Sequence, residues 1–193
     1  MSTFKISPRH IIMDHWQTLR SYGKSKVSWV DVGMQYGAPL VIAGFWVYST
    51  PTITSEFVAT VLTVVSIMAA LLLNLQVLLI GVVDKVADRY EALLNGTRGP
   101  AKNEVVGDRI EKARRVLLAQ TNSNVSYAIL VCLVLIIALL ASYVKEPNRL
   151  IGSIGLFIIY FLIAHFIVSF FMILQRVHVS LKSQIARLLP SDE

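Results

Sequence analysis

The sequence predicts an all-α polytopic membrane protein with four transmembrane helices, some of which extend into a cytoplasmic helical hairpin or collar. Three observations predict this fold class: long apolar runs, basic residues confined to alternate connections, and helical spacing of apolar residues between the runs. Of the 193 residues, 55% are hydrophobic and only 16% are charged, with a mean hydropathy of +0.63. A soluble chain usually carries about 25% charged residues. Because the apolar excess lies in a few runs, we expect a membrane protein.

Four segments reach the length of roughly 20 apolar residues that a helix needs to cross the hydrocarbon core. The clearest segment, 125–144, is uncharged throughout; segment 151–175 is interrupted only by His165, and segment 57–83 carries Asn74 and Gln76. Segment 33–50 is short and rich in glycine, so a full span is expected there with a re-entrant or interfacial segment as the alternative.

The basic residues decide the orientation. Sixteen of the 18 Lys and Arg residues fall in the two tails and in the connection between the second and third spans, against two in the other connections. The positive-inside rule places both termini in the cytoplasm, and an even number of spans fits this pattern. The chain then divides into an interfacial N-terminal segment, spans one and two, a cytoplasmic hairpin, spans three and four, and a cytoplasmic C-terminal helix: 1–32, 33–83, 84–124, 125–175 and 176–193.

The cytoplasmic segments carry apolar residues at helical spacing. Such small helical elements bury little surface alone, so we expect a homo-oligomer in the lipid bilayer, with bundling of one chain's own helices as the alternative. In the N-terminal segment, Ser7 suits a helix start and Ile12, Trp16 and Leu19 share one face. This pattern predicts an amphipathic helix that lies on the inner leaflet or packs against the cytoplasmic helices.

Two groups of polar residues fall inside predicted spans. Thr63, Ser66 and Asn74 belong to a stripe of small and polar residues that covers about 80° of the second span. The stripe indicates either a close helix–helix seam or a pore-lining face. His165 and Ser169 share one face of the fourth span. An intramembrane histidine gates or carries a proton, or else makes a hydrogen bond to a neighbouring helix.

A basic stretch in the hairpin is the candidate for ligand or partner binding. Arg109, Lys112, Arg114 and Arg115 are expected to dock a cytoplasmic partner protein or an anionic ligand such as a nucleotide or oligonucleotide. Acidic residues interleave with them, which favours a solvated, self-paired helix surface and gives no basis for DNA binding.

Enzymatic signatures are not found. The four histidines do not form a metal-ligand spacing, and Cys132 has no cysteine partner in the sequence. No phosphate-binding glycine loop appears either. We therefore expect no catalytic residues, no metal, no cofactor and no enzyme.

Four predicted spans with an internal hairpin, DKVADRYEALL followed by NEVVGDRIEKARRVLLAQ, resemble the small membrane subunits of bacterial anti-phage operons of the Kiwa or Hailong kind. The resemblance is architectural and carries no residue roles. It implies a location in a bacterial inner membrane, and either a membrane-disrupting channel held shut by a cytoplasmic signal or a membrane sensor that recruits a cytoplasmic effector. Two hypotheses follow: a homo-oligomeric channel or pore effector gated through its cytoplasmic helices, and a membrane anchor or sensor subunit.

Overall fold

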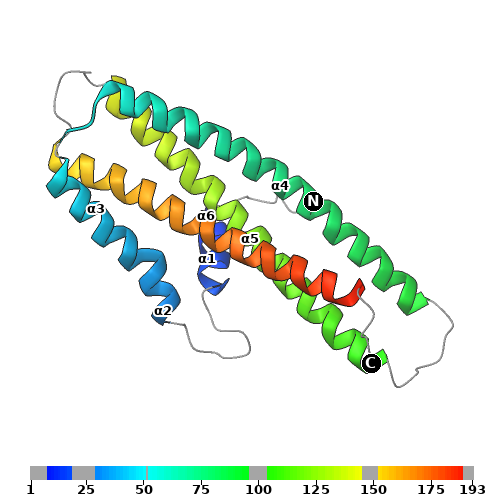
Figure 1. Ribbon diagram of the computed structural model, residues 1–193. Coiled ribbons are helices and arrows are strands. Elements are labelled where there is room, and N and C mark those ends of the chain that lie inside the picture. Colours follow the sequence, from blue (N-terminus) through cyan, green and yellow to red (C-terminus); the bar gives the residue numbers. More distant parts are fainter. Residues whose placement is uncertain (1–7, 19–28, 51, 96–103, 145–151, 189–193) are drawn as a thin grey trace.

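The structure, a computed structural model, is built of helices in all the segments it describes, which are residues 8–18, 29–50, 52–95, 104–144 and 152–188 (Figure 1). This confirms the predicted all-α fold class. In chain order the helices are α1 (Pro8–Thr18), α2 (Trp29–Val32), the π-helix η1 (Gly33–Gly37), α3 (Ala38–Ser49), α4 (Ser55–Asn95), α5 (Glu104–Val144) and α6 (Ser153–Leu188).

Three helices are long and apolar enough to cross a membrane, so the chain is a membrane protein. Their apolar segments are Ser55–Lys85 of α4, Val116–Ser142 of α5 and Ser153–Val179 of α6. The first predicted span, 33–50, differs from these because its residues are divided between η1 and α3. Two glycines bound η1, and Pro39 follows at the start of α3. Proline lacks the N–H that a regular helix turn requires, which accounts for an irregular backbone at this point.

The long helices lie side by side in a fixed order (Figure 1). Helix α5 contacts α4 on one side and α6 on the other, and α6 also contacts α3. Leu72 of α4, Leu135 and Leu139 of α5 and Ile173 of α6 are almost completely buried in the resulting core. Among the described elements α4 packs mainly on α5, with one ring contact between Phe57 near its start and Tyr160 of α6, and only 17% of its apolar segment is buried. The described part of the chain therefore leaves most of the apolar segment of α4 uncovered.

Helix α1 packs on α5 through its polar face. The predicted apolar face does not make this contact: Ile12 and Trp16 are 45% and 44% exposed, which leaves them available to the inner leaflet, and Leu19 lies outside the described residues. His15 and Thr18 are buried instead, at 0% and 7% exposure. Of the two predicted alternatives, packing through the apolar face is not the one observed, because the surface that α5 offers here is polar: Asn124 accepts hydrogen bonds from both buried side chains.

Candidate functional site

Polar side chains from α1, η1, α5 and α6 meet inside the bundle. Each of them is buried or half-buried, although the surrounding core is apolar. Buried polar groups are retained when they are hydrogen-bonded to one another, and these are. We call this group the polar core; it consists of His15, Thr18, Gln35, Asn124, Tyr127, His165, Ser169 and Arg176.

His165 of α6 joins two other elements of the polar core. Its Nδ1 lies 2.9 Å from the backbone oxygen of Gln35, and its Nε2 lies 2.8 Å from the hydroxyl of Tyr127. A carbonyl can only accept, so Nδ1 carries the proton and donates it to Gln35, and Nε2 accepts from the tyrosine. Both ring nitrogens of the neutral imidazole are thereby satisfied. His165 thus makes a hydrogen bond to a hydroxyl on a neighbouring helix. Of the two alternatives predicted from the sequence, this is the structural one, as opposed to a gating or proton-carrying role.

The sequence explains why the Gln35 carbonyl can accept this bond. In a regular α-helix that oxygen would receive the N–H of the residue four positions later, which here is Pro39. Proline has no N–H, so the oxygen lacks the donor that a regular α-helix would supply and has a lone pair for a side-chain donor. The amide of Gln35 also donates from Nε2 to Ser169 Oγ at 2.7 Å. One residue of the π-helix therefore makes two bonds to α6.

Asn124 of α5 organises the docking of α1. Its Oδ1 lies 2.9 Å from His15 Nδ1 and 2.8 Å from Thr18 Oγ1. Arg176 of α6 donates to the carbonyl of Thr18 at 2.9 Å. The ring of His15 also stacks on Tyr127, with centroids 3.8 Å apart and parallel planes. Through these contacts α1 is fixed to both α5 and α6.

The protonation of His15 is controlled by this burial. The pKa of His15 is lowered from 6.5 to about 4, mainly because burial removes water from around the ring. The hydrogen bond with Asn124 opposes this lowering of the pKa, and the nearby His165 and the positive charge of Arg176 add to it. With Nδ1 donating to Asn124, Nε2 is a buried acceptor that has no partner among the described residues. A proton there would create a buried cation without a hydrogen-bond acceptor. His15 is therefore neutral at pH 7.

The stripe of the second span lies on the opposite side of the molecule from the polar core. Thr63, Ser66 and Asn74 are all exposed, whereas Val65 and Leu72 of the same helix are buried against the core. At 100° per residue, the stripe is centred about 140° around α4 from these buried residues. It is therefore not a seam between two described helices of this chain. Gln76, on another face, donates to Ser126 of α5 at 3.0 Å.

The structure brings together only some of the residues singled out in the sequence. His165 and Ser169 lie in the polar core, and the residues of the α4 stripe lie apart from it. The four basic candidates, Arg109, Lys112, Arg114 and Arg115, lie in α5, but their side chains are outside the described part of the chain.

Sequence reasoning missed the residues that hold α1. His15, Thr18 and Asn124 were not singled out, because their partners are more than 100 residues away along the chain. One signal was available: the polar run Thr121–Asn124 directly precedes the apolar part of the third span. Four polar residues at the membrane end of a helix favour a polar contact there, and α1 makes that contact.

The fold and the polar core define an all-α membrane protein whose N-terminal helix is locked into the bundle by buried hydrogen bonds. In the described part of the chain, no three His, Cys, Asp or Glu residues are grouped so that they could hold a metal ion. Comparison of the chain with protein families, with curated proteins and with solved structures finds no match.

Proposed function

We propose that this chain forms a homo-oligomeric channel or pore-type effector in a bacterial inner membrane. One observation carries the proposal: the polar stripe of α4 is turned away from the other helices in the described part of the chain. Asn74 is exposed and lies only about 6 Å from the middle of the apolar segment Ser55–Lys85. An exposed amide at that depth is costly in lipid, so another copy of the chain or water lies against it.

Several copies arranged around an axis satisfy this stripe and create a path at the same time. Small residues allow neighbouring α4 helices to approach closely, and hydroxyl and amide groups bond across the contact or face water. The rest of α4 supports this placement, since large apolar side chains such as Leu71 and Leu78 are 56% and 62% exposed beside the stripe. These side chains suit lipid or a neighbouring copy.

The proposed topology has four spans with both termini in the cytoplasm. Within the predicted first span, η1 and α3 run without a break from Gly33 to Ser49, which is about 26 Å at the rise of an α-helix and reaches the lower end of the length that a spanning helix needs. The one-sided distribution of Lys and Arg also requires an even number of spans.

Gating is assigned to the parts of α4 and α5 beyond the membrane. Helix α4 continues without a break from its apolar segment to Asn95, and α5 begins at Glu104 before its own apolar segment. A continuous helix transmits a displacement at one end to the other. A cytoplasmic signal, as in anti-phage defence, would act on these ends and change the packing of the stripe.

Replacing Asn74 with leucine is expected to abolish the depolarisation caused by the open channel. The substitution removes the amide and places a branched apolar group on the path, while helix propensity favours leucine. The measurement is membrane potential, read with a voltage-sensitive dye in bacteria that express the protein. Val64→Leu is the matched control, since Val64 is also exposed on α4 but lies about 120° from the stripe. Equal depolarisation by wild type and Asn74→Leu would contradict a path along α4.

The second candidate function is a membrane anchor or sensor that recruits a cytoplasmic protein. It is favoured by the position of the basic stretch on the extension of α5, between Glu104 and the apolar segment that starts at Val116. Charges at that place face the cytoplasm in the proposed topology and are available to a soluble partner.

Under this alternative, charge reversal at Arg109 and Arg115 is expected to release the partner from membranes. The two substitutions replace the attraction between this face and an acidic surface of the partner with repulsion, which lowers the affinity for the partner at least tenfold. Co-purification from membranes, followed by identification of the retained protein, is the measurement. Lys182→Glu, a reversal on the extension of α6, is the control. Retention of the same partner by the double variant would exclude this face.

A further inference from the structure

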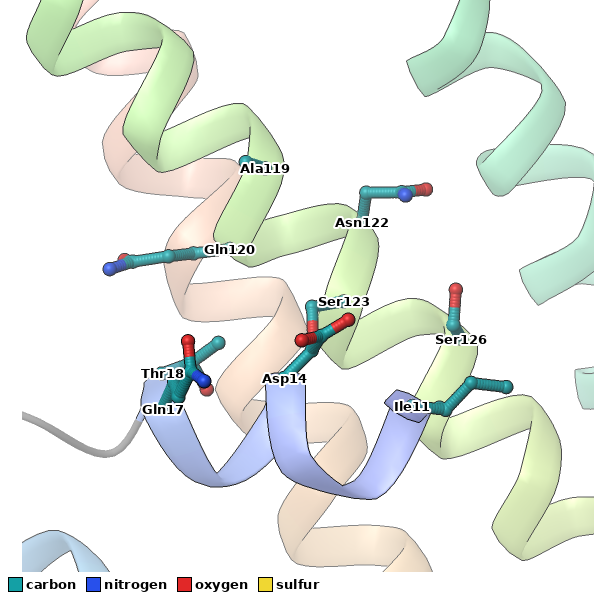
Figure 2. Close-up of a pocket in the computed structure, with 9 residues that line it drawn as sticks. All are labelled: Ile11, Asp14, Gln17, Thr18, Ala119, Gln120, Asn122, Ser123 and Ser126. Carbon is teal, nitrogen blue, oxygen red and sulfur yellow. The ribbon is translucent and has the colours of Figure 1, made fainter. Parts of the chain in front are cut away.

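Helix α1 has three faces of different chemistry. The first face contains His15 and Thr18 and is buried on α5 and α6. The second contains Asp14 and Gln17, which line a half-open polar groove of about 450 Å³ between α1 and α5 (Figure 2). The third is apolar and exposed; we call it the outer face of α1, and it consists of Ile12, Met13 and Trp16. An apolar face on a helix that is polar elsewhere requires a cover other than water.

The contacts of α1 place it at one boundary of the hydrocarbon core. Asn124, which bonds to Thr18, is 20 residues from the end of α5 at Val144, or about 30 Å at the rise of an α-helix. Arg176, which donates to the carbonyl of Thr18, is 23 residues from the start of α6 at Ser153, or about 34 Å. The hydrocarbon core is about 30 Å thick, so two spans independently place α1 at the same boundary, which is the cytoplasmic one in the proposed topology.

The outer face of α1 reaches to the membrane side of this boundary. The ring of Trp16 contacts the ring of Tyr36, with centroids 5.7 Å apart, and Tyr36 stacks on His165 at 5.2 Å. His165 is only 12 residues, or about 18 Å, from the start of α6, which is well inside the hydrocarbon core. The indole of Trp16 therefore lies no more than about 11 Å from a ring in the interior of the bilayer.

The charges around α1 favour lipid over a second copy of the chain as the cover of this face. Arg9 is exposed and falls within the arc of the outer face at 100° per residue, about one turn before Met13. An arginine at a membrane boundary reaches the lipid phosphates while the stem of its side chain stays among apolar groups. Asp14, by contrast, is exposed in the groove, where seven of the nine described lining residues are polar, so its carboxylate stays hydrated.

We propose that the outer face of α1 is inserted among the acyl chains of the inner leaflet while the opposite face is bonded to α5 and α6. Lipid is then one wall of the site in which α1 docks. A change in the packing of the inner leaflet therefore acts directly on the docking of α1, and through it on the polar core. Ion conduction plays no part in this inference, and its test measures lipid contact alone.

Collision of a spin label with two reagents distinguishes lipid from water and from protein. Labels are attached to Met13→Cys and, as the matched control on the groove side of the same helix, to Gln17→Cys; both positions are exposed. Both variants also carry Cys132→Ala, because Cys132 is the only cysteine of the chain. In liposomes, the label at position 13 should collide mainly with oxygen, which concentrates in hydrocarbon. The label at position 17 should collide mainly with a water-soluble nickel chelate, so the ratio of the two rates should differ severalfold between the positions.

Either of two results would overturn the proposal. A ratio at position 13 as low as that at position 17 would place the outer face in water, and low collision rates with both reagents at position 13 would show that protein, such as a second copy of the chain, covers it. Quenching of tryptophan fluorescence by brominated phosphatidylcholine decides the matter if the cysteine variants do not fold. The emission lost in Trp16→Phe is that of Trp16, and brominated lipid should quench this part of the wild-type signal. A Trp16 component that brominated lipid leaves unchanged would also contradict the insertion of this face.

Discussion

Lowering the pH from 7 to 4 is expected to release α1 from the bundle. The cause is His15, which is neutral in the docked helix because its pKa there is about 4, whereas a released histidine titrates near 6.5. The difference is equivalent to about 3 kcal/mol in the free energy of docking, or more than a hundredfold in the equilibrium. Few other single groups in the described chain are expected to have an effect of this size.

The direction follows from which state binds the proton. Above about pH 6.5 both states are unprotonated, and docking has its full stability. Between pH 6.5 and pH 4 the released helix binds a proton that the docked helix does not, so the docking of α1 becomes less stable as the pH is lowered. Below pH 4 no further loss of docking stability is expected. Among the charged and titratable groups around the ring, Arg176 of α6 repels a second positive charge. His165 of α6 is neutral in its hydrogen-bonded arrangement and would repel that charge only once protonated, and Tyr127 of α5 stacks on the ring. Asp14 directly precedes His15 on α1 and therefore accompanies the ring in both the docked and the released state.

Hydrogen–deuterium exchange of the peptide that contains residues 8–18, corrected for intrinsic exchange rates, measures this docking. His15→Gln keeps a donor for Asn124 but cannot titrate, and its docking should not depend on pH in this range. His10→Gln removes an exposed histidine from the same helix and should retain the wild-type pH dependence. Protection of α1 that stays constant from pH 7 to pH 4 in the wild type would contradict the prediction.

Replacing His165 with leucine is expected to lower the free energy of unfolding by about 2–4 kcal/mol. Leucine fills a similar space but leaves the hydroxyl of Tyr127 and the carbonyl of Gln35 without their partner inside the bundle. Each buried group left unsatisfied costs about 1–3 kcal/mol. The measurement is unfolding of the purified protein by titration with a denaturing detergent. His178→Leu, the same substitution at an exposed position of α6, should change stability by less than about 0.5 kcal/mol.

A double-mutant cycle with Tyr127→Phe separates the hydrogen bond from the effect of shape. When His165 is already leucine, removal of the tyrosine hydroxyl should be nearly neutral or stabilising, because the unpaired group is then gone. A coupling free energy of about 0.5–1.5 kcal/mol is expected, in line with hydrogen bonds between transmembrane helices. Strict additivity of the two substitutions would show that the two side chains do not interact.

The sequence by itself determined the secondary structure class and the membrane-crossing segments. A helix that crosses the bilayer must satisfy its backbone internally and present about 20 apolar residues, and this requirement is visible without any partner. The predicted segments 57–83, 125–144 and 151–175 accordingly overlap the apolar parts of α4, α5 and α6. The stripe on α4 also follows from the chain alone, since it needs only the angle between successive residues.

Only the tertiary structure decided which faces meet. Helical periodicity places Asn74 opposite Leu72 but does not say which of the two faces α5, and it does not indicate that Pro39 exposes a carbonyl to His165. It also left open whether the apolar face of α1 meets the inner leaflet or other helices, and it did not identify the polar face that contacts α5. The physical reason is the same in each case: a polar group is stable wherever it finds a partner, and the partners of His15 and His165 come from distant parts of the chain. Apolar burial depends on a residue's own chemistry, whereas a buried hydrogen bond depends on two residues that the fold must bring together.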